Sequence, residues 1–526
     1  MSGVYVVSSL LRICKRRHPQ WIFGGRNGFT LFRTCRQYHP RQLQNRRNNH
    51  HASKPLSASG TVGLDSNNIQ NSDFIKHAAD EKVNEPELNF SDTKKSFKTK
   101  TTLEISRALA VLKMCSYSYF VDNSLKLMKI SQMILGKKLS YYLLKSTFYG
   151  QFVAGHDIPS ILKRVERLKL AGIAPIISIP LEDGFGGPNV SDEDRDIICA
   201  DNIKVMERCV DQTLQVCDNT KPILMQVRVS PLVWPEVLIK IGELIVKNGY
   251  TYGDGGPISI QNFAKGLNQV NKKIERIPEL TDTEFEHLNN TLHRLDRLAQ
   301  YAVDNNTTLQ IDAEYINLNM GITLLCLALM YKYNQTKPLI WNTYQTYLKA
   351  AHSNICRDIA MAEKLGFTFG VKLVRGAYND TERLRSKEMG YEDPINQDYE
   401  ATNIMYNKSL TMMLNLIKTH DRKYSMIVAT HNEESLTLAV NKMTELGIDK
   451  TDGTVCFGQL LGMCDQVSYA LGQSGYLAYK SLPVGTVDQV MPYLSRRASE
   501  NRAVLAGAKR ERELLWRELK RRTMKI

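Results

Sequence analysis

The stretch PYLSRRASEN, near the C-terminus, contains two adjacent arginines whose types and spacing could bind a ligand. In a helix, Tyr493, Arg496, Arg497 and Glu500 are spaced i, i+3, i+4 and i+7, so all four lie on one face. Guanidinium groups bind planar anions through paired hydrogen bonds. The spacing therefore predicts a helix that holds an anion.

The distribution of charge along the chain limits the size of that anion. Of the formal net charge of +15, residues 1–64 carry +11, from nine Arg and two Lys with no Asp or Glu, which leaves +4 for the rest. A folded body with so small an excess of charge is not built for a polyanion. A nucleic-acid-binding protein that uses the basic N-terminus and the run KRERELLWRELKRR remains the least favoured alternative.

The N-terminal segment has the composition of a targeting sequence. It is Arg-rich, contains Ser and lacks acids, which predicts a mitochondrial transit peptide over residues 1–50 and a location in the matrix. Residues 51–100 are polar and rich in Ser and Asn, and we expect a disordered linker. The ten cysteines include no C-x-x-C pair, so they are expected to be reduced. No apolar stretch reaches the ~18 residues that a membrane span needs.

Polar clusters follow five short, apolar, β-branched runs later in the chain. They are Asp312 with Glu314, Tyr344 with Gln345 and Tyr347, VRGAY at 374–378, THN at 430–432 and QLLGM at 459–463. A single Asp or His at a strand end is more often a helix cap, but five such clusters indicate one large ligand spread across the strand ends. Lys372 and Arg375 suit a phosphate or an electron-rich ring, and Gly376 allows the backbone to approach a ligand closely.

Eight such runs must position these side chains. They cover residues 175–181, 223–229, 308–314, 338–345, 368–374, 425–431, 454–461 and 476–483. Helical segments separate them, and crossovers of this length force neighbouring strands to be parallel. The pattern predicts a (β/α)8 barrel over residues 173–526, with an N-terminal helical segment over 101–172 and the arginine helix over the barrel mouth. A doubly wound open sheet remains an alternative. In a barrel, chemistry collects at the C-terminal ends of the strands.

Several common signatures are missing from the sequence. It has no Walker loop, no G-x-G-x-x-G that opens a helix, no H-E-x-x-H and no G-x-S-x-G. We therefore expect no metal site and no serine nucleophile.

Six motifs occur along the chain in this order: DAEYINLN, WNTYQTYLK, GVKLVRGAY, ATHNEES, FGQLLGMCDQ and PYLSRRASEN. With these motifs, the chain resembles the proline dehydrogenase family over roughly residues 140–520. The resemblance implies a distorted (β/α)8 barrel that holds FAD non-covalently at its C-terminal face and oxidises a cyclic imino acid. The stretches YGQFVAG, MGYEDPINQDYEAT and YKSLPVGTVDQVMPYL are most similar to members that act on trans-4-hydroxy-L-proline. L-proline is the alternative substrate.

The resemblance also implies roles for individual residues. Arg496 and Arg497 would hold the substrate carboxylate, with Tyr493 and Leu460 against the ring and Asp312 beside it. Glu500 would pair with an arginine at the edge of the cofactor site. The positions that would line FAD are Gln345, Lys372, Val374, Arg375, Gly376, Ala377, Tyr378, Thr430 and His431.

Three positions depart from the family pattern. Arg228 stands where many proline-specific members carry a lysine on strand two, and Arg228 and Asp312 are the predicted catalytic residues. Lys372 stands where bacterial members often carry arginine. Ser481 stands where proline-specific members carry a tyrosine that crowds C4 of the substrate ring. A serine would leave room and a hydrogen-bond partner for a 4-hydroxyl group, although extra space alone rarely excludes the smaller substrate.

The mechanism that follows from the resemblance has three steps. The imino acid binds with its carboxylate on the arginines, hydride passes from C5 to the flavin, and a quinone reoxidises the flavin. The product would be 3-hydroxy-1-pyrroline-5-carboxylate, or 1-pyrroline-5-carboxylate from proline. Contact with the inner membrane, where quinones reside, is a further expectation, with the C-terminal run as the contacting helix.

Overall fold

The computed structural model describes residues 88–181, 190–218, 220–248, 255–267, 273–500 and 508–524, without the side chains of 499 and 500. The predicted transit peptide over 1–50 lies outside these residues, as does the predicted linker up to residue 87.

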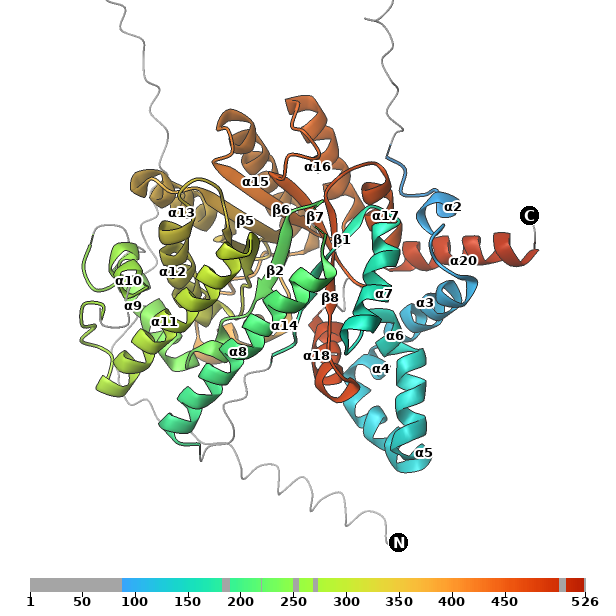
Figure 1. Ribbon diagram of the computed structural model, residues 1–526, viewed down its shortest axis with the longest axis horizontal. Helices are drawn as coiled ribbons and strands as arrows, with labels where there is room; N and C mark the ends of the chain where they lie inside the picture. Colours follow the sequence, from blue (N-terminus) through green and yellow to red (C-terminus); the bar gives the residue numbers. More distant parts are fainter. Residues whose placement is uncertain are drawn as a thin grey trace, which may run out of the picture. The chain divides into compact units, whose positions relative to one another are not determined.

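Eight parallel strands form a closed barrel in the order in which they occur in the chain (Figure 1). They are β1 (Ile173–Ser178), β2 (Ile223–Val227), β3 (Thr307–Ile311), β4 (Ile340–Gln345), β5 (Phe369–Val374), β6 (Tyr424–Ala429), β7 (Val455–Leu460) and β8 (Ala478–Pro483). The last strand pairs with the first, with Ile173 opposite Ala478. Because an open sheet would leave both strands as edges, this pairing confirms the predicted (β/α)8 barrel.

Helices cover the outside of the barrel, as a parallel sheet requires. Those between or after the strands are α8 (Asp192–Val216), α9 (Pro235–Lys247), α10 (Ile260–Gly266), α11 (Asp282–Asp304), α12 (Ile316–Tyr333), α13 (Ala351–Leu365), α14 (Asn379–Met389), α15 (Tyr399–Thr419), α16 (Glu433–Leu446), α17 (Asp465–Gln473), α18 (Val487–Glu500) and α20 (Lys509–Met524). A short 3-10 helix, Ser230–Leu232, follows β2. Helix α12 is apolar on most of its surface because α9 and α10 pack on it from outside.

The described N-terminal part of the chain is helical and packs beside the barrel. It comprises α2 (Thr93–Ser96), α3 (Thr102–Cys115), α4 (Ser118–Asp122), α5 (Ser124–Ser146), α6 (Phe148–Phe152) and α7 (Ile158–Lys169). Side-chain caps fix two of the helix starts, since Thr101 and Asp157 each form a capping box with the residue three positions later.

One boundary of the predicted linker needs correction. Residues 88–100 are folded, although they belong to the stretch predicted as disordered. Asp92 caps α2, and the ring of Phe97 is completely buried in a cluster with Ile105 of α3 and Leu515 of α20. The polar composition of this segment concealed two buried aromatic residues, Phe90 and Phe97, that secure it.

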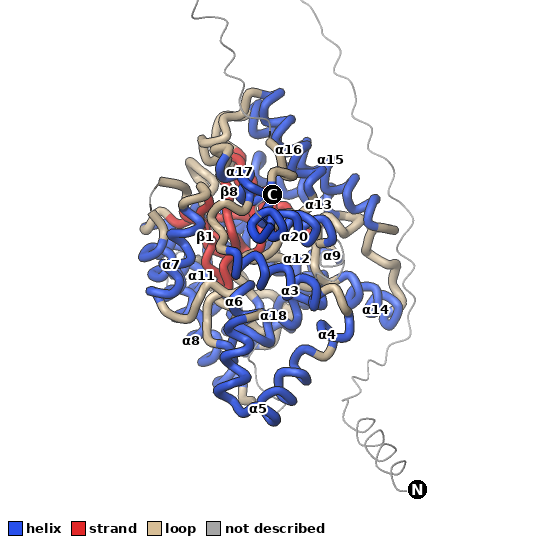
Figure 2. The backbone as a smooth tube through the Cα atoms, turned by 90° about the vertical axis from the view of Figure 1, so that its right-hand side faces the viewer, coloured by secondary structure: helices blue, strands red, loops and turns tan. Residues whose placement is uncertain are grey.

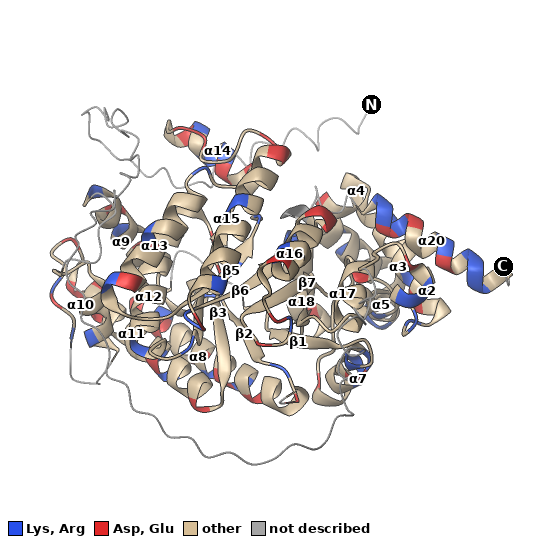
Figure 3. Cartoon of the chain, turned by 90° about the horizontal axis from the view of Figure 1, so that it is seen from above, with Lys and Arg blue, Asp and Glu red and all other residues tan. Residues whose placement is uncertain are grey.

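Helix α20 also differs from expectation. Lys and Arg gather on its surface (Figure 3), but Leu514 and Leu515 are buried against α3. The C-terminal run is therefore a packed element of the fold, in which protein covers Leu514 and Leu515 while Trp516 and Met524 stay exposed.

Within the described ranges, no helix is long and apolar enough to cross a bilayer.

Candidate active site

A cavity of about 620 Å³ opens at the C-terminal ends of the barrel strands. Below it, Ile176, Leu224, Trp341, Cys456 and Tyr479 form an apolar cluster inside the barrel. This cluster closes the lower half of the barrel, so a ligand reaches only the mouth. A volume of this size matches the range of cofactor and small-molecule sites.

The side chains around the cavity follow the alternation of the strands. Residues two apart on one strand point to the same side, and four strands each contribute such a pair. The pairs are Gln226 with Arg228, Gln310 with Asp312, Thr343 with Gln345, and Lys372 with Val374. The predicted site residues on different strands therefore face one space.

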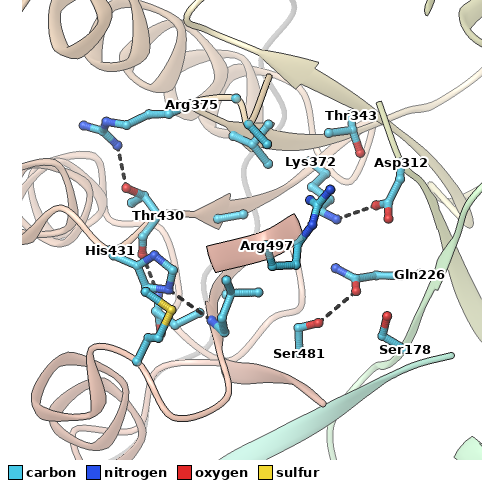
Figure 4. Close-up of a pocket in the computed structure, with 18 of the residues that line it drawn as sticks. Ser178, Gln226, Asp312, Thr343, Lys372, Arg375, Thr430, His431, Ser481 and Arg497 are labelled. Atoms are coloured by element: carbon cyan, nitrogen blue, oxygen red, sulfur yellow. Dashed lines mark hydrogen bonds and ion pairs between the residues drawn. The ribbon is translucent and has the colours of Figure 1, made fainter. Parts of the chain in front are cut away.

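Two ion pairs lie on the wall formed by β2, β3 and β5. Lys372 Nζ lies 2.6 Å from Asp312 Oδ1 (Figure 4). Arg228 Nε donates to Glu314 Oε2 at 2.8 Å, and the buried Glu314 also accepts the backbone N–H of Ser230 at 2.9 Å. Arg228, predicted to be catalytic, lines the cavity with its guanidinium tied to a carboxylate, which favours a structural and electrostatic role.

Arg375, directly after β5, provides a buried positive charge on the side of the cavity toward β6. Its guanidinium donates to Asn403 Oδ1 at 2.8 Å and to Ser435 Oγ at 3.0 Å, and it also donates to Thr430 (Figure 4). It lies 4.3 Å from the centroid of the Tyr406 ring, and burial lowers its pKa. All these partners are neutral, so the charge of Arg375 is oriented without being cancelled.

His431 is neutral in this site. The backbone N–H of Leu460 donates to His431 Nε2 at 3.1 Å, which leaves the proton of the neutral ring on Nδ1. Burial, together with the charges of Lys480 and Arg375, lowers the pKa of His431 to about 3. The ring therefore links the end of β6 to β7 and cannot serve as a cation at neutral pH. Gln345, on the far wall, donates to the carbonyl of Glu314 at 2.8 Å.

Gly376 lines the cavity, and a neighbouring side chain gives a further reason for a glycine at this position. Its φ is +132°, and a Cβ at this position would lie 2.2 Å from Cδ1 of Tyr347. The missing side chain makes room for the Tyr347 ring, which is itself buried. The neighbouring Ala377 and Tyr378 line the cavity.

Helix α18 brings one of the two predicted arginines to the cavity. Arg497 projects into it (Figure 4), and its guanidinium carbon lies 5.7 Å from the ring centroids of both Tyr378 and Tyr493. Tyr493 and Leu460 line the cavity, whereas Arg496 does not. Consecutive helical residues point about 100° apart, so only one of the two adjacent arginines can point directly at the ligand space. The side chain of Glu500 lies outside the described residues.

Most of the chain is similar to known proteins. Residues 191–510 match the family model of proline dehydrogenase. The chain is 44% identical to hydroxyproline dehydrogenase of Xenopus laevis, over 83% of this chain and 90% of that protein. It is 40% identical to hydroxyproline dehydrogenase of Homo sapiens, over 82% of this chain and 92% of that protein.

The chain belongs to the proline dehydrogenase family.

Other members of the proline dehydrogenase family are more distant. Mitochondrial proline dehydrogenase 1 of Homo sapiens is 31% identical over 83% of this chain and 90% of that protein. Among solved structures, proline utilization A of Bdellovibrio bacteriovorus, inactivated by N-propargylglycine, superposes with a TM-score of 0.54 at 16% identity. The match covers 81% of this chain but only 40% of that chain, so it supports the barrel fold alone. Family membership makes the chain a dehydrogenase.

The structure adds glutamines that sequence reasoning missed in this family member. Ser481 Oγ donates to Gln226 Oε1 at 2.9 Å (Figure 4), and Gln226 stands opposite Gln310 in the register of β2 and β3. Gln310 is completely buried, and neither atom of its amide has a hydrogen-bond partner. A polar residue within the otherwise apolar end of TTLQI, two positions before Asp312, was the signal that marked it as inward-facing.

Proposed function

We propose that this member of the family oxidises trans-4-hydroxy-L-proline to 3-hydroxy-1-pyrroline-5-carboxylate with FAD as its cofactor. The observation that carries the choice of substrate is the hydrogen-bonded pair of Ser481 and Gln226 on the cavity wall. The hydroxyl of Ser481 and the amide of Gln226 can form hydrogen bonds with a hydroxyl on the substrate ring. The relatives named for hydroxyproline, at 44% and 40% identity, support the same choice over those named for proline, at 31%.

The residues of the cavity fit FAD. Arg375 and Lys372 supply positive charge for its pyrophosphate or for the electron-rich edge of its ring. The buried amide of Gln310 and the side-chain oxygen of Gln466, which also lines the cavity, have no partner among the residues that the structure describes and would gain one from a polar ligand. Thr430, Gln345 and Val374 complete the surface that would hold it. A bound flavin supplies the two-electron acceptor for hydride from the substrate.

The chain's own residues bind and orient the substrate. Arg497 binds the carboxylate, and Tyr493 and Leu460 lie against the ring and keep water away from it. Fixing the carboxylate end sets the position of C5 at the opposite side of the ring nitrogen. Oxidation removes a hydride from C5 and a proton from the ring nitrogen, which leaves a C=N bond. The Asp312–Lys372 pair lies beside this reaction space and fixes its electrostatic potential.

We further propose that a quinone is the final electron acceptor and that the protein works in mitochondria. The acid-free, Arg-rich composition of residues 1–64 supports this location, as do relatives whose names include the word mitochondrial. Placement in the matrix is part of the same proposal.

A flavin spectrum and substrate kinetics test the proposal. Purified protein supplemented with FAD should be yellow, and trans-4-hydroxy-L-proline should bleach it under anaerobic conditions. The value of kcat/KM should be higher for hydroxyproline than for L-proline. A higher kcat/KM for L-proline would make L-proline the substrate of the same reaction. Colourless protein that binds no flavin would reject the proposed enzyme and favour the nucleic-acid alternative.

A further inference from the structure

The surface of the helical hairpin α4–α5, residues 118–146, exposes an unusual amount of apolar side chain. Met133 is 84% exposed, Ile134 75%, Tyr142 69% and Tyr119 65%. Ile130, Leu135, Leu139, Leu143 and Phe120 are exposed as well. Single exposed apolar residues are normal, but a run of them on one element marks an interaction surface.

The backbone presents this surface at a bend. Gly136, with φ of +73° and ψ of +161°, interrupts α5 and divides it into two short helices. Nothing lies within 4 Å of the position that a Cβ would take there. Met133, Ile134 and Leu135 immediately precede this bend, so the apolar side chains are concentrated next to it. Figures 1 and 2 both place α5 at the edge of the described fold, away from the barrel strands.

The charge of the hairpin identifies the kind of partner. Residues 118–146 contain five exposed lysines, Lys126, Lys129, Lys137, Lys138 and Lys145, and a single acid, Asp122 at the end of α4. Lysine is depleted in the cores of protein interfaces, whereas exposed lysines that flank apolar and aromatic side chains are typical of helices lying on anionic bilayers. Each lysine near such a surface strengthens binding by about fivefold. One acid from another element approaches, because Asp488 of α18 lies 3.9 Å from Lys137.

The opposite side of the hairpin packs on the helix that carries the candidate substrate arginine. Met128, Tyr141 and Leu144 pack in a cluster with Val490 and Met491 of α18. Ser124 Oγ lies 2.6 Å from Ser495 Oγ, and Tyr141 donates to Asp488. The hairpin therefore has an inner side committed to α18 and an outer side that the described part of the chain leaves uncovered.

We propose that the α4–α5 hairpin docks the protein on an anionic lipid bilayer, with Met133 and Ile134 inserted at the bend and the lysines at the headgroups. The helix lies in the interface and does not cross the bilayer. Docking places α18 and the cavity mouth next to the membrane. The surface assigned to the membrane is thus α5, and not the C-terminal run, whose Leu514 and Leu515 are buried against α3. The inference does not depend on the identity of the substrate.

The test uses the full-length protein with vesicles of phosphatidylcholine alone or mixed with phosphatidylglycerol. Because the basic N-terminus also attracts anionic lipid, binding is localised by hydrogen–deuterium exchange. Peptides from residues 118–146 should gain protection with the anionic vesicles only. Peptides from α14 should be unchanged.

Matched variants test whether the bend of α5 is the docking surface. The double variant Met133→Asp/Ile134→Asp should lose the protection over 118–146 and bind anionic vesicles at least tenfold more weakly in salt that screens the N-terminus. Leu170→Asp, at a residue that is 78% exposed on the surface after α7, should behave like wild type. Hydroxyproline oxidation with a soluble dye, measured without vesicles, should be equal in all three proteins, so failure of docking is distinguished from failure of the proposed activity.

Three results would overturn the inference. Vesicle binding by the double variant as strong as that of wild type would assign docking to another surface. Vesicle binding by wild type without protection over 118–146 would do the same. A dimer in solution that Met133→Asp/Ile134→Asp converts to a monomer, with no vesicle binding by wild type, would make the hairpin an interface between two copies of the chain.

Discussion

We propose that a few side chains on β8, β2 and β3 determine which substrate ring the cavity accepts. Ser481 stands opposite Ile176 of β1 in the barrel register, and its hydroxyl donates across the barrel to Gln226. Gln226 in turn stands opposite Gln310. A hydroxyl and two amides thus face this space, and a proline ring has no hydroxyl that could bond to the Gln310 amide or to the hydrogen-bonded pair of Ser481 and Gln226. Unpaired buried polar groups discriminate against a ligand that lacks the matching hydroxyl.

We predict that Ser481→Tyr reverses the order of the two substrates. The phenol ring fills the space beside Gln226, so kcat/KM for hydroxyproline should fall by about 10- to 100-fold and that for L-proline should fall less. Ser481→Ala is the matched control, because it removes the hydroxyl without filling the space and should cause a smaller loss. Equal losses for both substrates in Ser481→Tyr would contradict the assignment of this wall to the 4-hydroxyl group.

We predict that Gln310→Met stabilises the ligand-free protein and weakens the holoenzyme. The buried amide lacks partners, so an apolar side chain of similar shape should raise the free energy of unfolding by about 1 kcal/mol or more. Loss of the amide should raise the Kd for FAD or the KM for substrate. Denaturant unfolding and flavin titration measure the two effects. A destabilised variant with unchanged binding would mean that the amide serves the fold.

Sequence patterns predicted which residues line this site better than they predicted the neighbours that those side chains contact. The inward positions of Asp312, Lys372 and Ser481 follow from strand periodicity, and the structure places all three at one cavity. The spacing of Arg496 and Arg497 placed both on one face, but it could not say which of them a neighbouring element would face. The ring of Tyr347, 29 positions earlier in the chain, packs where a side chain at position 376 would lie, so no local sequence pattern predicts the need for Gly376.

Helix α18 connects the candidate substrate site to the helical hairpin. Its inner residues contact α5 and α6, while Tyr493 and Arg497 reach the cavity. The strands were predictable because each is a short apolar run between helices, and all eight occur where expected. Helix α2 was not, because four residues with a polar composition have no periodicity to detect. Its existence depends on the burial of Phe97 by elements from both ends of the chain.

We predict that Met491→Ala impairs substrate binding more than chemistry. Met491 is 5% exposed in the cluster that holds α18, and its truncation should lower the free energy of unfolding by about 2–5 kcal/mol. A looser α18 should raise KM severalfold while kcat changes little. The matched control is Met413→Ala in α15, a fully buried methionine away from the cavity, which should lose stability but keep its KM. An equal rise of KM in both variants would contradict a specific role for α18.

The two ends of the described chain meet at a buried charged cluster beside the barrel mouth. Asp465, at the start of α17, pairs with Lys100 from the N-terminal part and with Lys480 of β8 at 2.9 Å. Glu511 of α20 accepts the backbone N–H groups of Cys464 at 2.8 Å and of Asp465 at 3.1 Å. Burial opposes the charge of Asp465, but the two lysines outweigh it and lower its pKa. Burial and the charge of Asp465 raise the pKa of Glu511 to about 7.

We predict that the stability of the Glu511→Gln variant, relative to that of wild type, increases as the pH rises. In the folded protein Glu511 keeps its proton up to about pH 7, whereas in the unfolded chain it loses the proton near its ordinary pKa of 4.5. The stability from this raised pKa is complete below the unfolded value and disappears as the pH rises through about 7. Glutamine stays neutral at every pH, so the free energy of unfolding of the variant relative to wild type should increase over this interval.

Denaturant unfolding at about pH 5 and about pH 8 measures this difference. Glu518→Gln on the same helix is the matched control. Burial opposes the charge of Glu518, but Arg521 and Arg522 outweigh it and lower its pKa, so this carboxylate is ionised across the whole interval and its replacement should cost the same at both pH values. A pH-independent effect of Glu511→Gln would mean that Glu511 is ionised throughout. In that case the two backbone hydrogen bonds to Glu511, together with the Lys480 ammonium beside Asp465, would stabilise the carboxylate more than burial and the Asp465 charge destabilise it. An ionised Glu511 would then join the C-terminal helix to the barrel.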